Sequence, residues 1–160
     1  MTNNGIASVQ RERATLRAAA RDDLPAIEKL LSAGRLPVAG VESTIGNFLV
    51  AESRDELVGA IGLELYGSAA LLRSVVVADS VRGTGLGAQL VNEIIREADE
   101  KGVRQVFLLT TTAEHYFPRF GFERITRDEV PESVKQSVEF RGACPASAIV
   151  MMREVLPPAK

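Results

Sequence analysis

The feature that most constrains this chain is an apolar strand that leads through a glycine-rich loop into an amphipathic helix. Residues 69–78 are almost wholly apolar and include Val75-Val76-Val77, which is typical of a buried strand. From Leu86 onward, apolar residues recur every four positions as far as Ala98, and Gly102 follows as a stop signal. A helix that buries one face directly after a buried strand must pack back onto the sheet that contains the strand.

The segments on both sides of this unit predict an α+β domain with a mixed sheet. Two apolar segments before it are separated by short polar turns, which indicates an antiparallel meander. Gly59 and Gly62 within the second of these segments indicate a bulge or a close approach of another chain segment. Further strands are predicted at Thr15–Ala18, Asn47–Ser53, Leu57–Tyr66, Val106–Thr110 and Ala148–Val155, and helices from Asp22 to Gly34 and from Ala113 to Phe120. Residues 35–46 show no clear period and are expected to be a loop or a short broken helix.

Composition sets the broad class. The chain of 160 residues suits one domain, with residues 1–13 and 157–160 as expected tails around a domain at 14–156. A formal net charge of −2 gives no basic field that would favour nucleic acid. We find no apolar run long enough to span a membrane, no secretory leader and a single cysteine, so a cytoplasmic protein is expected. Nothing in the sequence suggests a bound metal.

The glycine-rich loop points to an anionic ligand. Glycines let the backbone approach an anion closely, and the first turn of a helix offers unpaired N–H groups to phosphate. Arg82 adds a fixed fork of donors at the same place. A plain structural turn is the open alternative. A P-loop fits less well because no lysine follows the glycines, and a Rossmann loop would come early in a parallel sheet.

Two segments of this sequence resemble the GNAT superfamily of acyl-CoA-dependent N-acyltransferases. The loop Arg82-Gly83-Thr84-Gly85-Leu86-Gly87 is similar to the family's R/Q-x-x-G-x-G/A motif, and residues 113–122 are similar to its A-x-x-F-Y-x-x-x-G-F segment. The element order is also the family's. The resemblance therefore implies a GNAT-like domain, six or seven strands flanked by about four helices, with acetyl-CoA as co-substrate and a homodimer as a possible assembly.

Two further segments suggest a narrower branch. Residues 109–117 resemble amino-acid N-acetyltransferases that act on glutamate-like substrates. Residues 36–42 and 141–148 resemble a branch encoded with arsenic-resistance genes. A small amino-acid-like amine, and a role in resistance to arsenic or to toxic amino-acid analogues, would follow from this resemblance.

The resemblance also implies direct acetyl transfer to an amine. Backbone N–H groups near Val75 and Val77 would hold the pantetheine arm and the thioester carbonyl, and residues 82–87 would bind the pyrophosphate. The family often places a tyrosine that acts as general acid four residues before the glycine of the G-F pair. Here that position is Phe117, and Tyr116 precedes it by one step, a rotation of about 100° on a helix. Tyr116 is the candidate general acid, with a partly buried structural tyrosine as the alternative.

Glu42 is the first candidate for the base that deprotonates the incoming amine, because it lies in a loop that the family closes over the substrate. A solvated loop carboxylate is the alternative. His115, the only histidine, and water relayed through backbone carbonyls are the other options.

Arg73 and Ser74 are the candidate substrate-binding residues. An arginine in an apolar strand needs a partner, and a substrate carboxylate would supply one. We expect Arg73 to share a strand face with Val75, two residues on. An intramolecular salt bridge is the alternative. Cys144 is expected to be a buried or pocket-lining thiol rather than a metalloid ligand or a nucleophile.

The sequence thus predicts an acetyl-CoA-dependent N-acetyltransferase for a small amino-acid-like amine. Two other functions stay open. One is acetylation of another small amine or of a peptide, and the other is a non-catalytic acetyl-CoA sensor.

Overall fold

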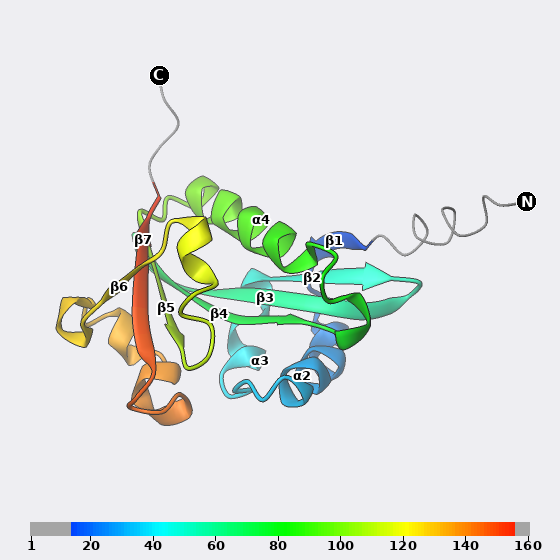
Figure 1. The fold of residues 1–160 in the computed structure, drawn as a ribbon, viewed down its shortest axis with the longest axis horizontal. Helices are drawn as coiled ribbons and strands as arrows, with labels where there is room; N and C mark the ends of the chain where they lie inside the picture. Colours follow the sequence, from blue (N-terminus) through cyan, green and yellow to red (C-terminus); the bar gives the residue numbers. More distant parts are fainter. Residues whose placement is uncertain (1–13, 156–160) are drawn as a thin grey trace, which may run out of the picture.

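A seven-stranded mixed sheet organises the computed structural model, which describes residues 14–155 (Figure 1). The order across the sheet is β1-β2-β3-β4-β5-β7-β6. Every neighbouring pair is antiparallel except β4 and β5, which run parallel. The strands are β1 (Thr15–Ala18), β2 (Phe48–Ser53), β3 (Glu56–Tyr66), β4 (Ala69–Val77), β5 (Gln105–Thr110), β6 (Glu123–Ile125) and β7 (Ile149–Glu154). The α+β fold class and the mixed sheet are therefore confirmed.

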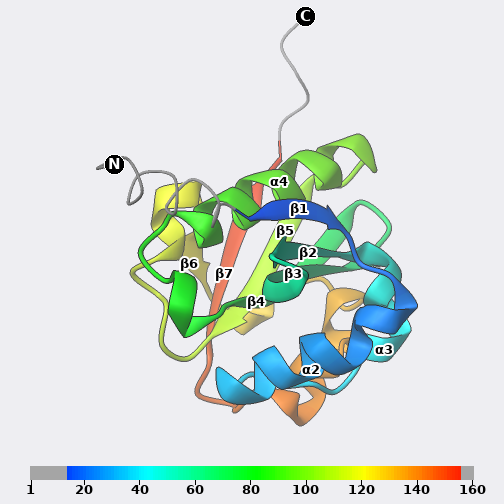
Figure 2. The ribbon, with the colours of Figure 1, turned by 90° about the vertical axis from the view of Figure 1, so that its right-hand side faces the viewer.

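Helices cover both faces of this sheet. The longest, α4 (Leu86–Glu100), lies across one face, while α2 (Leu24–Ala33) and α3 (Val41–Thr44) lie on the other (Figures 1 and 2). Short helical turns supply the rest: η1 (Arg21–Asp23), η2 (Ile45–Asn47), η3 (Asp79–Val81), η4 (Phe117–Phe120), η5 (Arg127–Glu129), η6 (Val134–Gln136) and η7 (Glu139–Ala143). No helix in the described residues is long and apolar enough to cross a membrane.

The apolar periodicity of α4 decides where the main core forms. Its inward residues pack against both halves of the sheet and are all buried: Leu86, Leu90, Val91, Ile94, Ile95 and Ala98. On the opposite face, Ile27 and Leu31 of α2 pack against Phe48, Val50 and Val76 in a second cluster. Removing apolar surface from water stabilises a fold by about 25 cal/mol per Å². The two clusters therefore stabilise the sheet from both of its faces.

A bulge in β4 reverses one expectation about side-chain direction. Arg73 pairs with Gly62 and Val76 pairs with Ala60, so Ser74 and Val75 together face the single residue Ile61. Ser74 adopts a positive φ of 63°, which an L-residue rarely does. The extra residue breaks the alternation, so Val75 packs towards the α4 core while Arg73 lies on the other face. The expectation that they share a face was wrong.

The two halves of the sheet part beyond the middle of β4. Pairing between β4 and β5 covers only Ala69 to Leu71 against Gln105 to Phe107. The remainder of β4, from Leu72 to Val77, pairs with β3 alone, and the end of β5 pairs with β7 alone. The sheet therefore opens between its two central strands, on the side where β4 leads into α4.

Local predictions differ from the structure at the ends of elements. The helix expected from Asp22 begins instead as η1, and α2 starts at Leu24, because the carboxylate of Asp23 accepts the N–H of Ala20 at 2.7 Å. The helix expected over residues 113–120 is only η4, and Gly121 ends it with φ 88°. Strand β6 was not predicted. The expected tails, 1–13 and 157–160, lie outside the described residues.

We predict that Gly62→Ala destabilises the fold by at least about 1–3 kcal/mol, because a Cβ there would lie 2.2 Å from the ring of Phe48. The free energy of urea unfolding measures this loss. Gly46→Ala is the control, since a Cβ at Gly46 meets no atom within 4 Å. Equal stabilities for the two variants would contradict the close packing of β3 on Phe48.

Candidate active site

A cavity of about 920 Å³ opens where β4 and β5 part. One end is formed by the start of α4, with residues 81–83 and 85–88. The walls come from residues 72–77 of β4 and residues 108–113 at the end of β5. The other end is formed by residues 34–37 and by Glu139, Ala143, Cys144, Pro145 and Ala148. The cavity therefore lies between a helix start and a polar cluster near the C-terminal segment.

The start of α4 presents unpaired backbone donors to this cavity. Gly83 and Gly85 have φ of 81° and 87°, so the loop can turn tightly into the helix. The first helical hydrogen bond runs from the N–H of Gln89 to the carbonyl of Gly85. The N–H groups of residues 86–88 precede it, and no side chain caps them. An anion at this point would meet both these donors and the positive end of the helix dipole.

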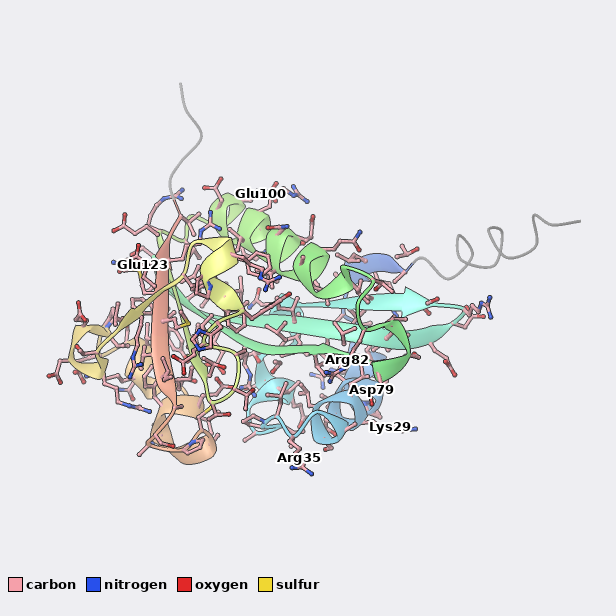
Figure 3. The ribbon with its side chains drawn as sticks, in the orientation of Figure 1. Lys29, Arg35, Asp79, Arg82, Glu100 and Glu123 are labelled. Atoms are coloured by element: carbon pink, nitrogen blue, oxygen red, sulfur yellow. The ribbon has the colours of Figure 1, made fainter. Side chains whose placement is uncertain are left out.

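Arg82 lies beside the same helix start and lines the cavity. Its side chain is 65% exposed and forms an ion pair with Asp79 at 2.9 Å (Figure 3). An exposed pair of this kind contributes little to stability, so Arg82 can turn to another anion at small cost. Thr84 fixes the loop by donating its hydroxyl hydrogen to the carbonyl of Val81 at 2.6 Å.

Tyr116 also lies next to the start of α4. A Cβ at Gly87 would be 2.9 Å from the Tyr116 hydroxyl oxygen, so the missing side chain leaves space for the phenol. Burial raises the pKa of Tyr116. Phe117 is buried in the main core, although it lines the cavity too. The one-step displacement of the tyrosine thus places its hydroxyl at the helix start, and its role as an acid stays a prediction.

Arg73 is wholly buried at the opposite end and is held by its own chain. Its Nη1 donates to Glu64 Oε2 at 2.7 Å, its Nε donates to Ser74 Oγ at 3.0 Å, and its Nη2 donates to the Pro37 carbonyl at 3.3 Å. Glu139 Oε2 lies 3.4 Å from Nε as a second ionic partner. These contacts correspond to the intramolecular salt bridge that the sequence left open, so a substrate carboxylate here would be a third around one guanidinium.

Two carboxyl groups, those of Glu64 and Glu139, share the guanidinium of Arg73, and Glu139 has the weaker contact with it. Glu64 is held at short distance by Arg73 and also accepts the Tyr66 hydroxyl at 2.6 Å. Glu139 lies farther from the guanidinium, is 96% buried and lines the cavity. Burial raises the pKa of Glu139 to about 7, against the favourable charge of Arg73, and the charge of Glu64 raises it further. This carboxyl group can therefore gain and lose a proton near neutral pH.

The structure does not bring every predicted residue to the cavity. Glu42 is exposed on α3 and His115 is exposed before η4, and neither lines the cavity. Sequence reasoning missed Glu64 and Glu139. A charge inside the apolar strand around Glu64 was a usable signal, as it was for Arg73. Glu139 gave none, because its segment has no regular period. Within residues 14–155, no three metal-binding side chains cluster.

We predict that Glu139→Gln changes the pH dependence of stability. Between about pH 4.5 and pH 7 the folded chain keeps a proton that the unfolded chain has released, so wild-type stability falls as the pH rises through this window. The loss attributable to Glu139 is on the order of 3 kcal/mol at about 1.4 kcal/mol per pKa unit. Urea unfolding from pH 5 to pH 8 should show the variant gaining stability relative to wild type. A constant difference across that range would contradict this prediction.

We predict that Cys144 is an unreactive thiol in the folded protein. Burial, together with the charge and hydrogen bond of Glu139, raises its pKa to about 12. Alkylation by iodoacetamide at pH 8 should be at least about 100-fold slower than in denaturant, because the thiolate is the reactive species. Mass spectrometry after incubation with acetyl-CoA should find no acetyl group on Cys144. An acetylated Cys144 would show that the thiol acts as a nucleophile.

Comparison with known proteins places this arrangement in a family. A family model described as "Acetyltransferase (GNAT) domain" matches residues 44–124. An amino-acid acetyltransferase of Mycobacterium tuberculosis is 30% identical over 132 residues, covering 76% of this chain and 75% of that protein. An amino-acid acetyltransferase of Ralstonia nicotianae is 33% identical over 94 residues, but the match covers 58% of this chain and only 21% of that protein.

A solved structure shares the fold. N-acetylglutamate synthase from Neisseria gonorrhoeae, complexed with coenzyme A and N-acetyl-glutamate, superposes with a TM-score of 0.77 at 22% identity, over 89% of this chain and 35% of that one. The matched residues include all of β2 to β5, the start of β6 and the whole glycine loop. The chain therefore belongs to the GNAT acetyltransferase family.

Proposed function

We propose that this chain is an acetyl-CoA-dependent N-acetyltransferase that transfers the acetyl group directly to the amine of a small amino-acid-like substrate. The observation that carries this proposal is the cavity between β4 and β5, with uncapped helical N–H groups at one end and a buried ionic cluster at the other. A nucleotide-bearing thioester fits the first end, and an amine fits the second.

The coenzyme would lie along the opened edge of β4. Its pyrophosphate would be bound by Arg82, Gly83, Thr84, Gly85, Leu86 and Gly87, where the loop offers N–H groups and an exposed guanidinium. Beyond Leu71 the edge of β4 that faces β5 has no strand partner, so the backbone near Val75 and Val77 can bond the pantetheine arm. A donor that polarises the thioester carbonyl stabilises the transition state by a few kcal/mol.

The relatives support an amino acid as the acceptor. Those compared above are described as amino-acid acetyltransferases, and the gonococcal enzyme was solved with N-acetyl-glutamate. In this chain the acceptor end is bounded by residues 34–37 and by the segment around Cys144. These regions overlap residues 36–42 and 141–148, which resemble the arsenic-resistance branch, so amino-acid analogues that contain arsenic are a rational part of the substrate search.

Release of CoA tests the proposal. The chain is incubated with acetyl-CoA and single amines, and free thiol is measured against a panel of acidic amino acids, their arsenical and phosphorus analogues, neutral amino acids and polyamines. We expect release with an amino-acid-like acceptor, together with a product heavier by one acetyl group. Tight binding of acetyl-CoA without release for any amine would contradict the enzyme and favour a sensor.

We predict that Arg82→Ala raises the KM for acetyl-CoA about tenfold, the effect of losing roughly 1.4 kcal/mol of charge-assisted bonding to phosphate. The kcat should change little, because Arg82 would bind the coenzyme equally in the ground and transition states. Arg96→Ala is the control, since Arg96 lies on α4, the helix that follows the loop of Arg82, but pairs with Glu93 and Glu100 and does not line the cavity. Equal KM values for acetyl-CoA in the two variants would show that Arg82 does not bind the coenzyme.

A further inference from the structure

We propose that Glu139 is the base of this site: its carboxylate receives the ammonium group of the acceptor and takes the proton that must leave before nitrogen can attack. This assignment rests on the proposed function and names the residue that the sequence could not identify. It replaces the first candidate, Glu42, which the structure leaves exposed on α3 and away from the cavity.

Position is the first argument for Glu139. It lines the cavity at the end opposite the start of α4, so an acetyl group carried along β4 would lie between the helix start and this carboxyl. Arg73, Ser74 and Cys144 line the same end. Of these, the thiol of Cys144 is held protonated by burial, with a pKa of about 12, and the guanidinium of Arg73 offers only N–H donors, which leaves the carboxyl as the group that can accept a proton.

Charge is the second argument. The titratable groups that bear on Glu139 are Arg73 from β4, Glu64 from β3 and Cys144 from the segment after η7. When both acids are ionised, two carboxylates share one guanidinium, and the nearer acid, Glu64, has the shorter contact. The cluster then has an excess negative charge beside the cavity. An ammonium group would neutralise this excess, whereas a substrate carboxylate would increase it.

Proton affinity is consistent with this role. Burial raises the pKa of Glu139 to about 7, so near neutral pH the carboxylate form is available and is still basic enough to hold a transferred proton. Arg73 is a positioning residue in this account, because it touches Glu139 and Glu64 rather than the reacting atoms.

The transfer balances as follows. One N–H proton of the ammonium group passes to Glu139 Oε, directly or through one water, and the freed lone pair forms the C–N bond with the thioester carbon. The tetrahedral intermediate collapses with cleavage of the C–S bond, and the electron pair leaves on sulfur. The second nitrogen proton ends on the CoA thiol, and Glu139 releases its own proton to solvent, which regenerates the base.

The test is the pH profile of kcat/KM for the best acceptor from the panel, between pH 5.5 and pH 9. The kcat/KM of wild type should rise with pH, and the midpoint of this ascending limb should lie near pH 7. Glu139→Gln should lose this limb and fall at least about 100-fold at pH 8, which is the lower range of a general base. Its Kd for CoA should change less than about threefold, which shows that the variant folds and binds coenzyme.

Two further comparisons sharpen the result. Glu132→Gln is the matched control, because Glu132 is a carboxylate seven residues before Glu139 in the sequence, its side chain is 86% exposed and it does not line the cavity. With an acceptor analogue whose amine is already unprotonated at pH 7, the difference in kcat/KM between wild type and Glu139→Gln should be smaller, because this amine needs no base before it attacks.

The outcomes separate the two proposals. If wild type turns over and Glu139→Gln keeps both the limb and the rate, Glu139 is not the base and the acetyltransferase stands. If only Glu42→Gln loses the rise of kcat/KM with pH, Glu42 on α3 is the base and the assignment of Glu139 is wrong. If wild type releases no CoA with any amine, the proposed function fails and the assignment of Glu139 fails with it.

Discussion

The buried guanidinium of Arg73 is the contact on which the acceptor end of the molecule depends. One side chain joins β4 to β3 through Glu64, to the segment before α3 through the Pro37 carbonyl, and to the C-terminal segment through Glu139. Pro37 and Glu139, two of the residues that it joins, are far apart in sequence. Removing Arg73 would leave buried carboxylates without a counter-charge, a change that commonly costs 3–5 kcal/mol.

The cavity exists because two local distortions meet in β4. Its bulge at Ser74 turns Arg73 to one face and Val75 to the other, and its partner β5 stops pairing just before this point. The free edge leads through η3 and the glycine loop into α4, whose first turn has unpaired N–H groups beside the same cavity. The proposed coenzyme and acceptor site thus lies where the two central strands of the sheet are no longer paired.

Sequence patterns could predict the parts of this architecture that rest on periodicity. The apolar stripe of α4, the antiparallel meander and the glycine loop all have short-range signals, and each lies where it was expected. The bulge could not be foreseen, because it shifts a register that alternation assumes to be regular, and it invalidated the shared face of Arg73 and Val75. Glu139 was missed for a different reason: its importance comes from burial against Arg73, a contact between residues 66 positions apart in a segment without a repeating pattern.

The most direct test of this account is a crystal structure of the chain with CoA and the N-acetylated product. We expect the pyrophosphate on the N–H groups of residues 86–88, and the product nitrogen within about 3 Å of the Glu139 carboxyl or joined to it by one water. A pyrophosphate bound elsewhere, or a product nitrogen turned away from Glu139 towards α3, would contradict it.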